Sequence, residues 1–492
     1  MANFSLLFWA SLTLCGAVTF RSSELYKKIQ RGKNNNNNRT SDDDGLSDEV
    51  KKVHATLLKK YLFVYLMATL SDWLQGPYVY ALYSDYGFEQ HHIAQLFVAG
   101  FGSSMIFGSF VGSIADWGGR RLFVILFAVV YAASCMTKHF KDYGILMLGR
   151  LLGGVSTSLL FSVFESWLIR AHADADLPKQ CLAKSFSWAA FGNSVVAILA
   201  GLIANNIAHA GPMTPVTDLI YKGGYLNPFD LALVALLFCG FGARFLWEEN
   251  YGDADNNGEQ SNGKGRVKWY DGLRNAWTTT VRNRDIFLCG IISSLYEGSM
   301  YIFVFMWTPL LKSFLKAGDD DLPFGLIFAT FMVCCMTGSS LFSILVEKFP
   351  VEKLAVVIFA VGAVAMAIVA MEINETTSFL GMNLFEITVG MYFPIMGTMK
   401  GGIVPEDKRA AIYNLYRIPL NFIVLFSLLT DLTPSISFTL NACMLGVATL
   451  AQSVLTKRRL EATGQVKDTN DSIPLLEPKG SEDASAAVPP PV

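Results

Sequence analysis

The chain has 492 residues, of which 52% are hydrophobic and 16% charged, and its formal net charge is −2. Soluble domains carry about 25% charged residues, so a large part of this chain lacks the polar surface of a soluble fold. The slightly acidic balance argues against a nucleic-acid partner, because such partners favour a basic surface.

The eight cysteines and six histidines indicate neither catalysis nor a metal site. All cysteines except Cys181 lie inside apolar runs, without the paired spacing of a disulfide framework or a zinc site. The sequence also lacks the His-Glu-x-x-His, Gly-x-Ser-x-Gly and phosphate-loop motifs of common enzyme classes. We therefore expect no enzyme, no metal and no cofactor.

Apolar runs long enough to cross a membrane recur along the chain. A helix needs about 20 such residues to span about 30 Å of hydrocarbon. One run covers Phe4–Phe20, six follow between Tyr61 and Trp247, and six more lie beyond a polar gap that ends near Arg284. The twelve later runs are centred near Thr69, Met105, Val129, Ser158, Val196, Leu236, Gly298, Val333, Val361, Val389, Phe422 and Met444.

These runs predict an all-α membrane protein of two six-helix bundles, preceded by one extra transmembrane helix. Residues 1–59 would form the extra helix and a cytoplasmic linker, and residues 60–247 the first bundle. Residues 248–284 would form a central cytoplasmic loop, 285–456 the second bundle, and 457–492 a disordered cytoplasmic tail.

The orientation follows from lysine and arginine, which favour the cytoplasmic side of short loops. The first run has no basic residues before Phe4 and is followed by a basic segment, so we expect a retained helix with its N-terminus outside rather than a cleaved signal peptide. The sequon at Asn374 would then lie outside and be a candidate for glycosylation. The basic residues expected on the cytoplasmic side are Arg120, Arg121, Arg170, Lys179, Lys348, Lys353, Lys400, Lys408, Arg409 and Lys457-Arg458-Arg459.

A loop motif follows the second span of the first bundle. It contains Gly112, Asp116, Gly119, Arg120 and Arg121. This spacing resembles the loop signature of the major facilitators, although Trp117 stands where many members carry a basic residue. The resemblance implies the major facilitator fold and a gating role, in which the acid and the arginines pair with charges and helix ends of the neighbouring half. A basic turn at the membrane edge without a gating role is the alternative.

Longer stretches resemble one branch of that superfamily, the molybdate-anion transporters. The resemblance covers roughly Tyr61 to Thr456 and implies uptake of molybdate, an oxyanion with two negative charges. The stretches are Asp72–Tyr83, Gly149–Trp167, Trp247–Gly252, Phe303–Pro309, Gly338–Leu341 and Arg417–Pro419.

Each half carries a carboxylate near the middle of its first span. Asp72 lies 12 residues past Lys60 and Glu297 lies 12 residues past Asp285, which places each about 18 Å along its helix. Ionisable groups at this depth usually line an aqueous path, and duplicated transporters bind substrate near the midplane. Hydrogen bonding between helices, without a transport role, is the alternative for both.

Two arginines and two asparagines complete the candidate site. The guanidinium groups of Arg150 and Arg417 suit an oxyanion, although Arg150 could equally close the scaffold through a salt bridge. Asn193 and Asn421 occupy matching places in the fifth spans and could donate to the anion or simply pack. Moving a divalent anion inward against 100 mV costs about 4.6 kcal/mol, so we expect proton coupling with Asp72 and Glu297 as carriers.

The tail contains Asp471, Leu475 and Leu476 in the pattern of an acidic dileucine sorting signal. We expect a monomer in the lipid bilayer of the cell membrane, or of an endosomal or vacuolar membrane if this signal acts. Its partners would be molybdate and protons. The competing hypotheses are a carrier of the same fold for another anion or a sugar, and a non-transporting membrane receptor or scaffold.

Overall fold

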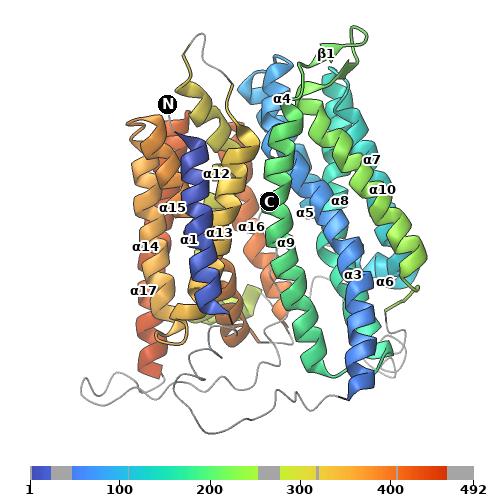
Figure 1. Cartoon of the computed structure of the whole chain (residues 1–492). Coiled ribbons are helices and arrows are strands. Elements are labelled where there is room, and N and C mark those ends of the chain that lie inside the picture. Colours follow the sequence, from blue (N-terminus) through green and yellow to red (C-terminus); the bar gives the residue numbers. More distant parts are fainter. Residues whose placement is uncertain are drawn as a thin grey trace. The chain divides into compact units, whose positions relative to one another are not determined.

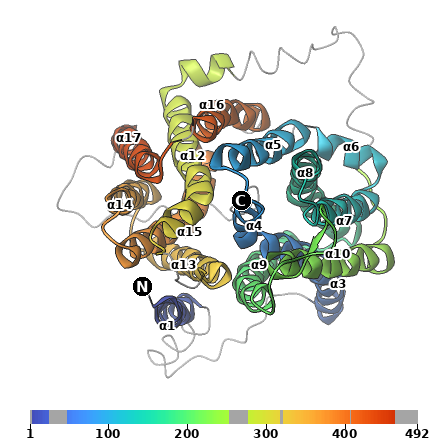
Figure 2. The same ribbon diagram turned by 90° about the horizontal axis from the view of Figure 1, so that it is seen from above.

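The computed structural model describes residues 3–23, 47–108, 110–252, 277–316, 321–405, 408–430 and 432–462. These residues group into two compact units. The N-terminal unit holds the described residues from 47 to 252 together with Pro323–Met332, and the C-terminal unit holds the others. Figures 1 and 2 show the helices of both units.

The N-terminal unit is a bundle of six spans with short elements between them. Its chain order is α3 (Asp48–Gln75), η1 (Gly76–Tyr78), α4 (Val79–Asp85), α5 (Gln90–Gly108), α6 (Val111–Gly118), α7 (Arg120–Thr137), α8 (Tyr143–Asp174), α9 (Lys179–Ala208), β1 (Thr214–Pro215), β2 (Tyr221–Lys222), η2 (Gly224–Leu226) and α10 (Asn227–Leu246). The strands β1 and β2 pair antiparallel, a small departure from the all-α expectation.

The C-terminal unit contains six further spans and the extra N-terminal helix. Its order is α1 (Phe4–Ser22), α12 (Arg284–Ser313), α13 (Phe324–Leu345), α14 (Val351–Ala370), α15 (Glu375–Ile403), α16 (Arg409–Leu429) and α17 (Pro434–Ala462). The first part of α13, through Met332, groups with the N-terminal unit.

Every span centre predicted from the sequence lies inside a helix. Within the described ranges, ten helices are long and apolar enough to cross a membrane. Helices α3, α5 and α16 fall outside that set; α3 starts in a stretch rich in lysine, and the apolar part of α16 is Leu415–Leu429. The first span bends at Pro77, because a proline without an N–H interrupts the helical hydrogen bonds and a short 3-10 segment joins α3 to α4.

Two helices extend beyond the predicted bounds of the six-helix bundles. Helix α3 already begins at Asp48, and α17 extends past Thr456 to Ala462. Helix α1 packs in the C-terminal unit, where Phe4 meets Phe379 at a centroid distance of 5.0 Å and Thr19 is hydrogen-bonded to Ser340 at 2.9 Å. Side chains of α13 and α15 therefore anchor α1.

Glycine brings the second and fourth spans of each unit into close contact. In the N-terminal unit, a Cβ at Gly154 of α8 would overlap the carbonyl of Gly100 in α5. In the C-terminal unit, Cβ atoms at Gly338 of α13 and Gly390 of α15 would overlap carbonyls of the facing helix. Small residues permit such backbone approach in membrane helices. The repeated contact is what a duplicated bundle predicts.

Candidate functional site

The carboxylate of Asp72 lies in the interior of the N-terminal unit. It accepts a short hydrogen bond from the hydroxyl of Tyr131, in the third span, and interacts electrostatically with Arg150, in the fourth. Beside it in α3, the indole of Trp73 donates to the amide oxygen of Asn193 in α9 at 2.8 Å. The side chains of Asp72, Tyr131 and Arg150 thus come from three spans of this unit, and the Trp73–Asn193 hydrogen bond joins two spans beside them.

Arg150 is held against α5 by uncharged groups. Its Nε donates to the carbonyl oxygen of Leu96 at 3.1 Å, and its guanidinium lies over the ring of Phe97 at 4.6 Å from the centroid. A Cβ at Gly100 would lie 2.8 Å from the guanidinium, so a larger residue there would displace the end of the arginine side chain. The carbonyl and the ring fix the plane of the guanidinium without neutralising its charge.

Glu297 is the centre of the polar cluster in the C-terminal unit. Its Oε1 accepts hydrogen bonds from Ser293 at 2.7 Å and from Tyr392 at 2.8 Å, and it pairs with the ammonium of Lys400 at 3.1 Å. Tyr392 stacks on Tyr296 at 4.1 Å between centroids, which fixes the direction of its hydroxyl. Removing one partner of an ion pair inside a helical bundle is destabilising, because the other charge is left uncompensated.

Lys400 is the residue that the sequence analysis misplaced. Its position near the end of a span put it among the cytoplasmic loop residues, but α15 runs on to Ile403 and its side chain reaches Glu297. Arg150 and Lys400 both lie in fourth spans, but Arg150 is near the start of α8 and Lys400 is in the last turn of α15, so the repeat did not point to Lys400. Each unit nevertheless combines one carboxylate of its first span with a tyrosine hydroxyl and a cation.

The other predicted residues of the second half lie on α16. Arg417 is exposed and interacts electrostatically with Tyr301 of α12. Asn421 follows one turn later on the same helix and is partly buried. Within the described part of this unit, Arg417 joins neither the hydrogen bonds nor the ion pair of Glu297.

The predicted loop motif forms a closed set of contacts inside the N-terminal unit. Asp116 pairs with Arg120 at 2.7 Å, and Arg120 donates to the carbonyl of Ser166 at 3.0 Å. Glu249 accepts hydrogen bonds from the backbone N–H of Arg121 at 2.7 Å and of Leu122 at 3.2 Å. A carboxylate at the start of α7 satisfies unpaired N–H groups and stabilises the helix dipole.

The contacts that the motif's charges make here lie inside one unit. The partners come from the same unit, through the segment that follows α10. In that segment, the backbone N–H of Gly252 donates to the backbone carbonyl of Asp116 at 2.9 Å, and Trp247 stacks on Trp167 at 3.8 Å between centroids. The start of the predicted central loop is thus part of the first bundle.

Only one of the two predicted motif glycines is required sterically. Gly119 has φ +101°, and a Cβ there would lie 2.8 Å from the carboxyl carbon of Glu249. A Cβ at Gly112 would meet nothing within 4 Å. The turn, rather than a close helix approach, explains the glycine at position 119.

Two predicted modification or sorting positions lie away from these clusters. Asn374 caps α15, with its side-chain oxygen accepting from the N–H of Thr377 at 2.8 Å. The threonine of the sequon, Thr376, is already inside that helix. The sorting residues Asp471, Leu475 and Leu476 lie outside the described residues.

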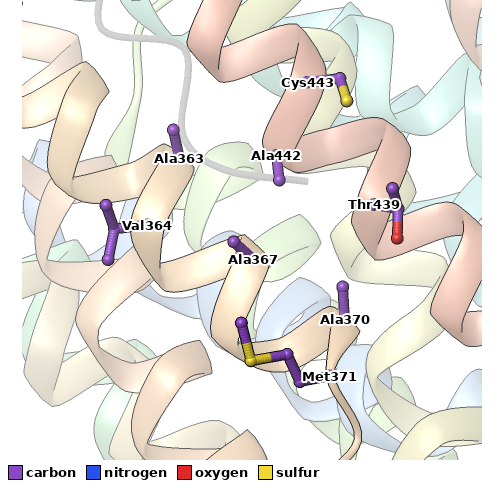
Figure 3. Close-up of a pocket in the computed structure, with 8 residues that line it drawn as sticks. All are labelled: Ala363, Val364, Ala367, Ala370, Met371, Thr439, Ala442 and Cys443. Carbon is purple, nitrogen blue, oxygen red and sulfur yellow. The ribbon is translucent and has the colours of Figure 1, made fainter.

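A groove of about 490 Å³ lies on the C-terminal unit between α14 and α17 (Figure 3). Small and apolar side chains line it, and none of the lining residues is charged. Its chemistry suits lipid tails rather than an anion. The lining residues are Ala363, Val364, Ala367, Ala370, Met371, Thr439, Ala442 and Cys443.

The fold agrees with comparisons to solved structures. The chain superposes on a nucleoside transporter with a TM-score of 0.61 at 12% identity, covering 82% of this chain and 99% of the other. It superposes on a xylose transporter from E. coli with a TM-score of 0.57 at 13% identity, covering 81% and 98%. At such identities the likeness shows the fold alone, which is that of the major facilitators.

Sequence comparisons show the family. A family model described as sugar transporters with 12 transmembrane spans matches residues 38–390. A molybdate-anion transporter of Takifugu rubripes is 33% identical over 75% of this chain and 78% of its own length. One of Xenopus tropicalis is 35% identical over 74% and 76%. This chain is therefore a multi-pass membrane transporter of the major facilitator superfamily and belongs to the family of the molybdate-anion transporters.

Proposed function

We propose that this transporter carries molybdate into the cytoplasm. The observation that carries the proposal is the identity of 33–35% with molybdate-anion transporters over about three quarters of the chain. The site chemistry supports it, since each unit holds a cation beside hydrogen-bond donors. Arginine, lysine and amide donors are the groups that bind oxyanions in proteins.

Substrate binding would compete with the protein's own carboxylates. A divalent oxyanion that approaches Lys400 weakens the Glu297–Lys400 pair, and Glu297 then gains more from taking up a proton than from remaining ionised. The same reasoning applies to Asp72 beside Arg150, with Tyr131 as the hydrogen-bond partner of the carboxyl. In this proposal, anion binding and protonation are coupled because both act on one ion pair.

The remaining predicted residues have supporting roles in the proposal. Asn193 and Asn421 would donate amide hydrogens to the anion, and Arg417 would contact it from α16. The contacts of Asp116, Arg120 and Arg121 would break and re-form as the transporter changes conformation. We propose that the protein acts as a monomer in the cell membrane.

Tracer uptake into proteoliposomes tests this proposal. Purified protein should take up labelled molybdate, and an inward proton gradient should accelerate the uptake at zero membrane potential. If molybdate uptake does not depend on the proton gradient, proton coupling is rejected, whereas molybdate remains the proposed substrate. Equal competition by sulfate and molybdate would reject molybdate selectivity.

A sugar is the second candidate substrate, because the matching family model is described as one of sugar transporters. A neutral sugar needs no cation in the site, so its transport would survive replacement of Lys400 by methionine. Uptake of a labelled hexose by the same proteoliposomes, unaffected by excess molybdate, would favour this alternative.

A further inference from the structure

Lys138 is a buried cation that the proposed transport mechanism does not use. It follows α7 directly and is 2% exposed. Its ammonium has no hydrogen-bond partner, and the ion pairs among the described residues do not include it. A charge removed from water without a partner costs several kcal/mol.

The surroundings of the Lys138 ammonium include residues of α4 and α8 and contain a second unsatisfied donor. The ammonium lies over the ring of Tyr83 in α4, 5.6 Å from its centroid, and the hydroxyl of Tyr83 is buried without a partner. Gly149 of α8 lies close to the ammonium, since a Cβ at this position would be 3.3 Å from it. The same Cβ would overlap the hydroxyl of Thr137, so the contact with Thr137 is what requires glycine here.

Nearby carboxylates are engaged elsewhere. Asp230 accepts a hydrogen bond from His139 at 3.0 Å, and Asp72 accepts one from Tyr131. Both carboxylates, like Lys138, interact electrostatically with the thiol of Cys135, but neither pairs with the lysine. The backbone carbonyl of Lys138 accepts a hydrogen bond from Tyr86 at 2.7 Å, which fixes the main chain and leaves the ammonium unsatisfied.

We propose that Lys138 and Tyr83 form a binding site for a small inorganic anion inside the N-terminal unit. The ammonium supplies the charge and the tyrosine hydroxyl supplies a directed donor. Gly149 immediately precedes Arg150, so the site adjoins the cation of the substrate cluster along α8. The proposal rests on the proposed function only for the identity of the anion, which is the transported molybdate or a resident halide.

Thermal unfolding of the purified full-length protein tests the site without a transport assay. The probes are molybdate and chloride, each added at matched ionic strength to protein in a gluconate buffer. We expect the wild-type unfolding midpoint to rise with the logarithm of the anion concentration, as binding to the folded state requires. A larger rise with molybdate assigns the site to the transport path, and a rise with chloride alone assigns it to a resident halide.

The decisive variant is Lys138→Met. It should remove the part of the anion-dependent rise that Lys138 contributes, so that a rise remaining with molybdate belongs to the clusters of Arg150 and Lys400. Without added anion it should unfold no lower than wild type, because it removes an unpaired buried charge. Lys141→Met is the matched control, an exposed lysine three residues further on, and should keep the rise. Tyr83→Phe should weaken binding about tenfold, the effect of one hydrogen bond to an ion.

The outcomes separate this proposal from the proposed function. No rise in the wild type, or an equal rise in Lys138→Met, would overturn the anion site even if molybdate is transported. Should Lys138→Met not fold, Lys138→Arg retains the charge and must retain the anion-dependent rise. If the wild type transports no molybdate but Lys138→Met still loses the anion-dependent rise, the anion site is supported and the proposed substrate is rejected.

Discussion

The charged side chains of the two units differ in how well they are satisfied. Glu297 has two hydroxyl donors and an ammonium, whereas Arg150 has a carbonyl and an aromatic ring. A satisfied ion pair must be broken before its members can bind anything else, while a loosely satisfied cation is available at once. In the proposed function, Arg150, which interacts with Asp72 only electrostatically, would be the better first contact for an anion, and Lys400 the better point of coupling.

The Glu297–Lys400 pair gives a prediction that separates stability from transport. Glu297→Gln and Lys400→Met should each lower stability by about 1–3 kcal/mol, because each leaves an unpaired charge or donor in a partly buried position. The double variant should recover most of the stability and remain inactive in molybdate uptake. Thermal unfolding and tracer uptake measure the two effects.

Lys457→Met serves as the control for that pair. Its side chain is 79% exposed and lies 4.0 Å from Glu461, so its removal should change neither quantity. Full uptake by the double variant would contradict a coupling role for the pair.

At the scale of elements, contacts between helices show which glycines are structural. Gly390→Ala would place a Cβ against the carbonyl of Cys335 in α13, and the helices must separate to admit it. We expect a loss of about 1–3 kcal/mol in stability. Gly446→Ala in α17, where a Cβ meets nothing within 4 Å, should instead gain up to about 1 kcal/mol. If the unfolding midpoints of both variants shift in the same direction, the close contact between Gly390 and Cys335 is contradicted.

The hairpin β1–β2 is attached to the end of α7 through His139. Nε2 of His139 pairs with Asp230 at 3.0 Å, and the backbone of His139 bonds Tyr221 at 2.9 Å. The hydrogen bond to Asp230 raises the pKa of His139 above its ordinary value, and burial opposes this effect. A raised pKa means that the contact stabilises fully below about pH 6.5, the ordinary value, and loses its contribution as the pH rises through the raised pKa.

Amide hydrogen exchange should report this loss. After correction for intrinsic rates, protection of residues 214–222 should fall as the pH rises from about 6 to about 9. His139→Gln should remove the pH dependence. His209→Gln, an exposed histidine at the end of α9, should leave it unchanged.

For the whole molecule, an extra N-terminal span changes the side of the membrane on which the N-terminus is expected. Helix α1 is anchored to α13 and α15 by Thr19 and Phe4, so we expect it to stay in the mature protein. One span followed by twelve, as the sequence predicts, would place the termini on opposite sides of the membrane. An N-terminal epitope tag should be accessible on intact cells, and a C-terminal tag only after permeabilisation. Loss of the N-terminal tag from the mature protein would show cleavage.

The sequence by itself determined the spans, the duplication, the loop motif and the superfamily. Hydrophobic length sets a membrane helix independently of its neighbours, and the motif and the intramembrane carboxylates are visible as local patterns. The spans follow from such local signals, whereas the confirmed fold class and transporter function rest on the resemblance of the motif and of longer stretches to known transporters.

Only the tertiary structure decided how the charges are partnered. Lys400 finds Glu297 across 103 positions of sequence, and Arg121 finds Glu249 across 128. The placement of α1 in the C-terminal unit and the unsatisfied ammonium of Lys138 likewise depend on which helix faces which. The residues next to a charged side chain in the sequence do not identify a partner that lies far away in the chain. Side-chain pairing depends on the rotation and depth of the helices rather than on composition.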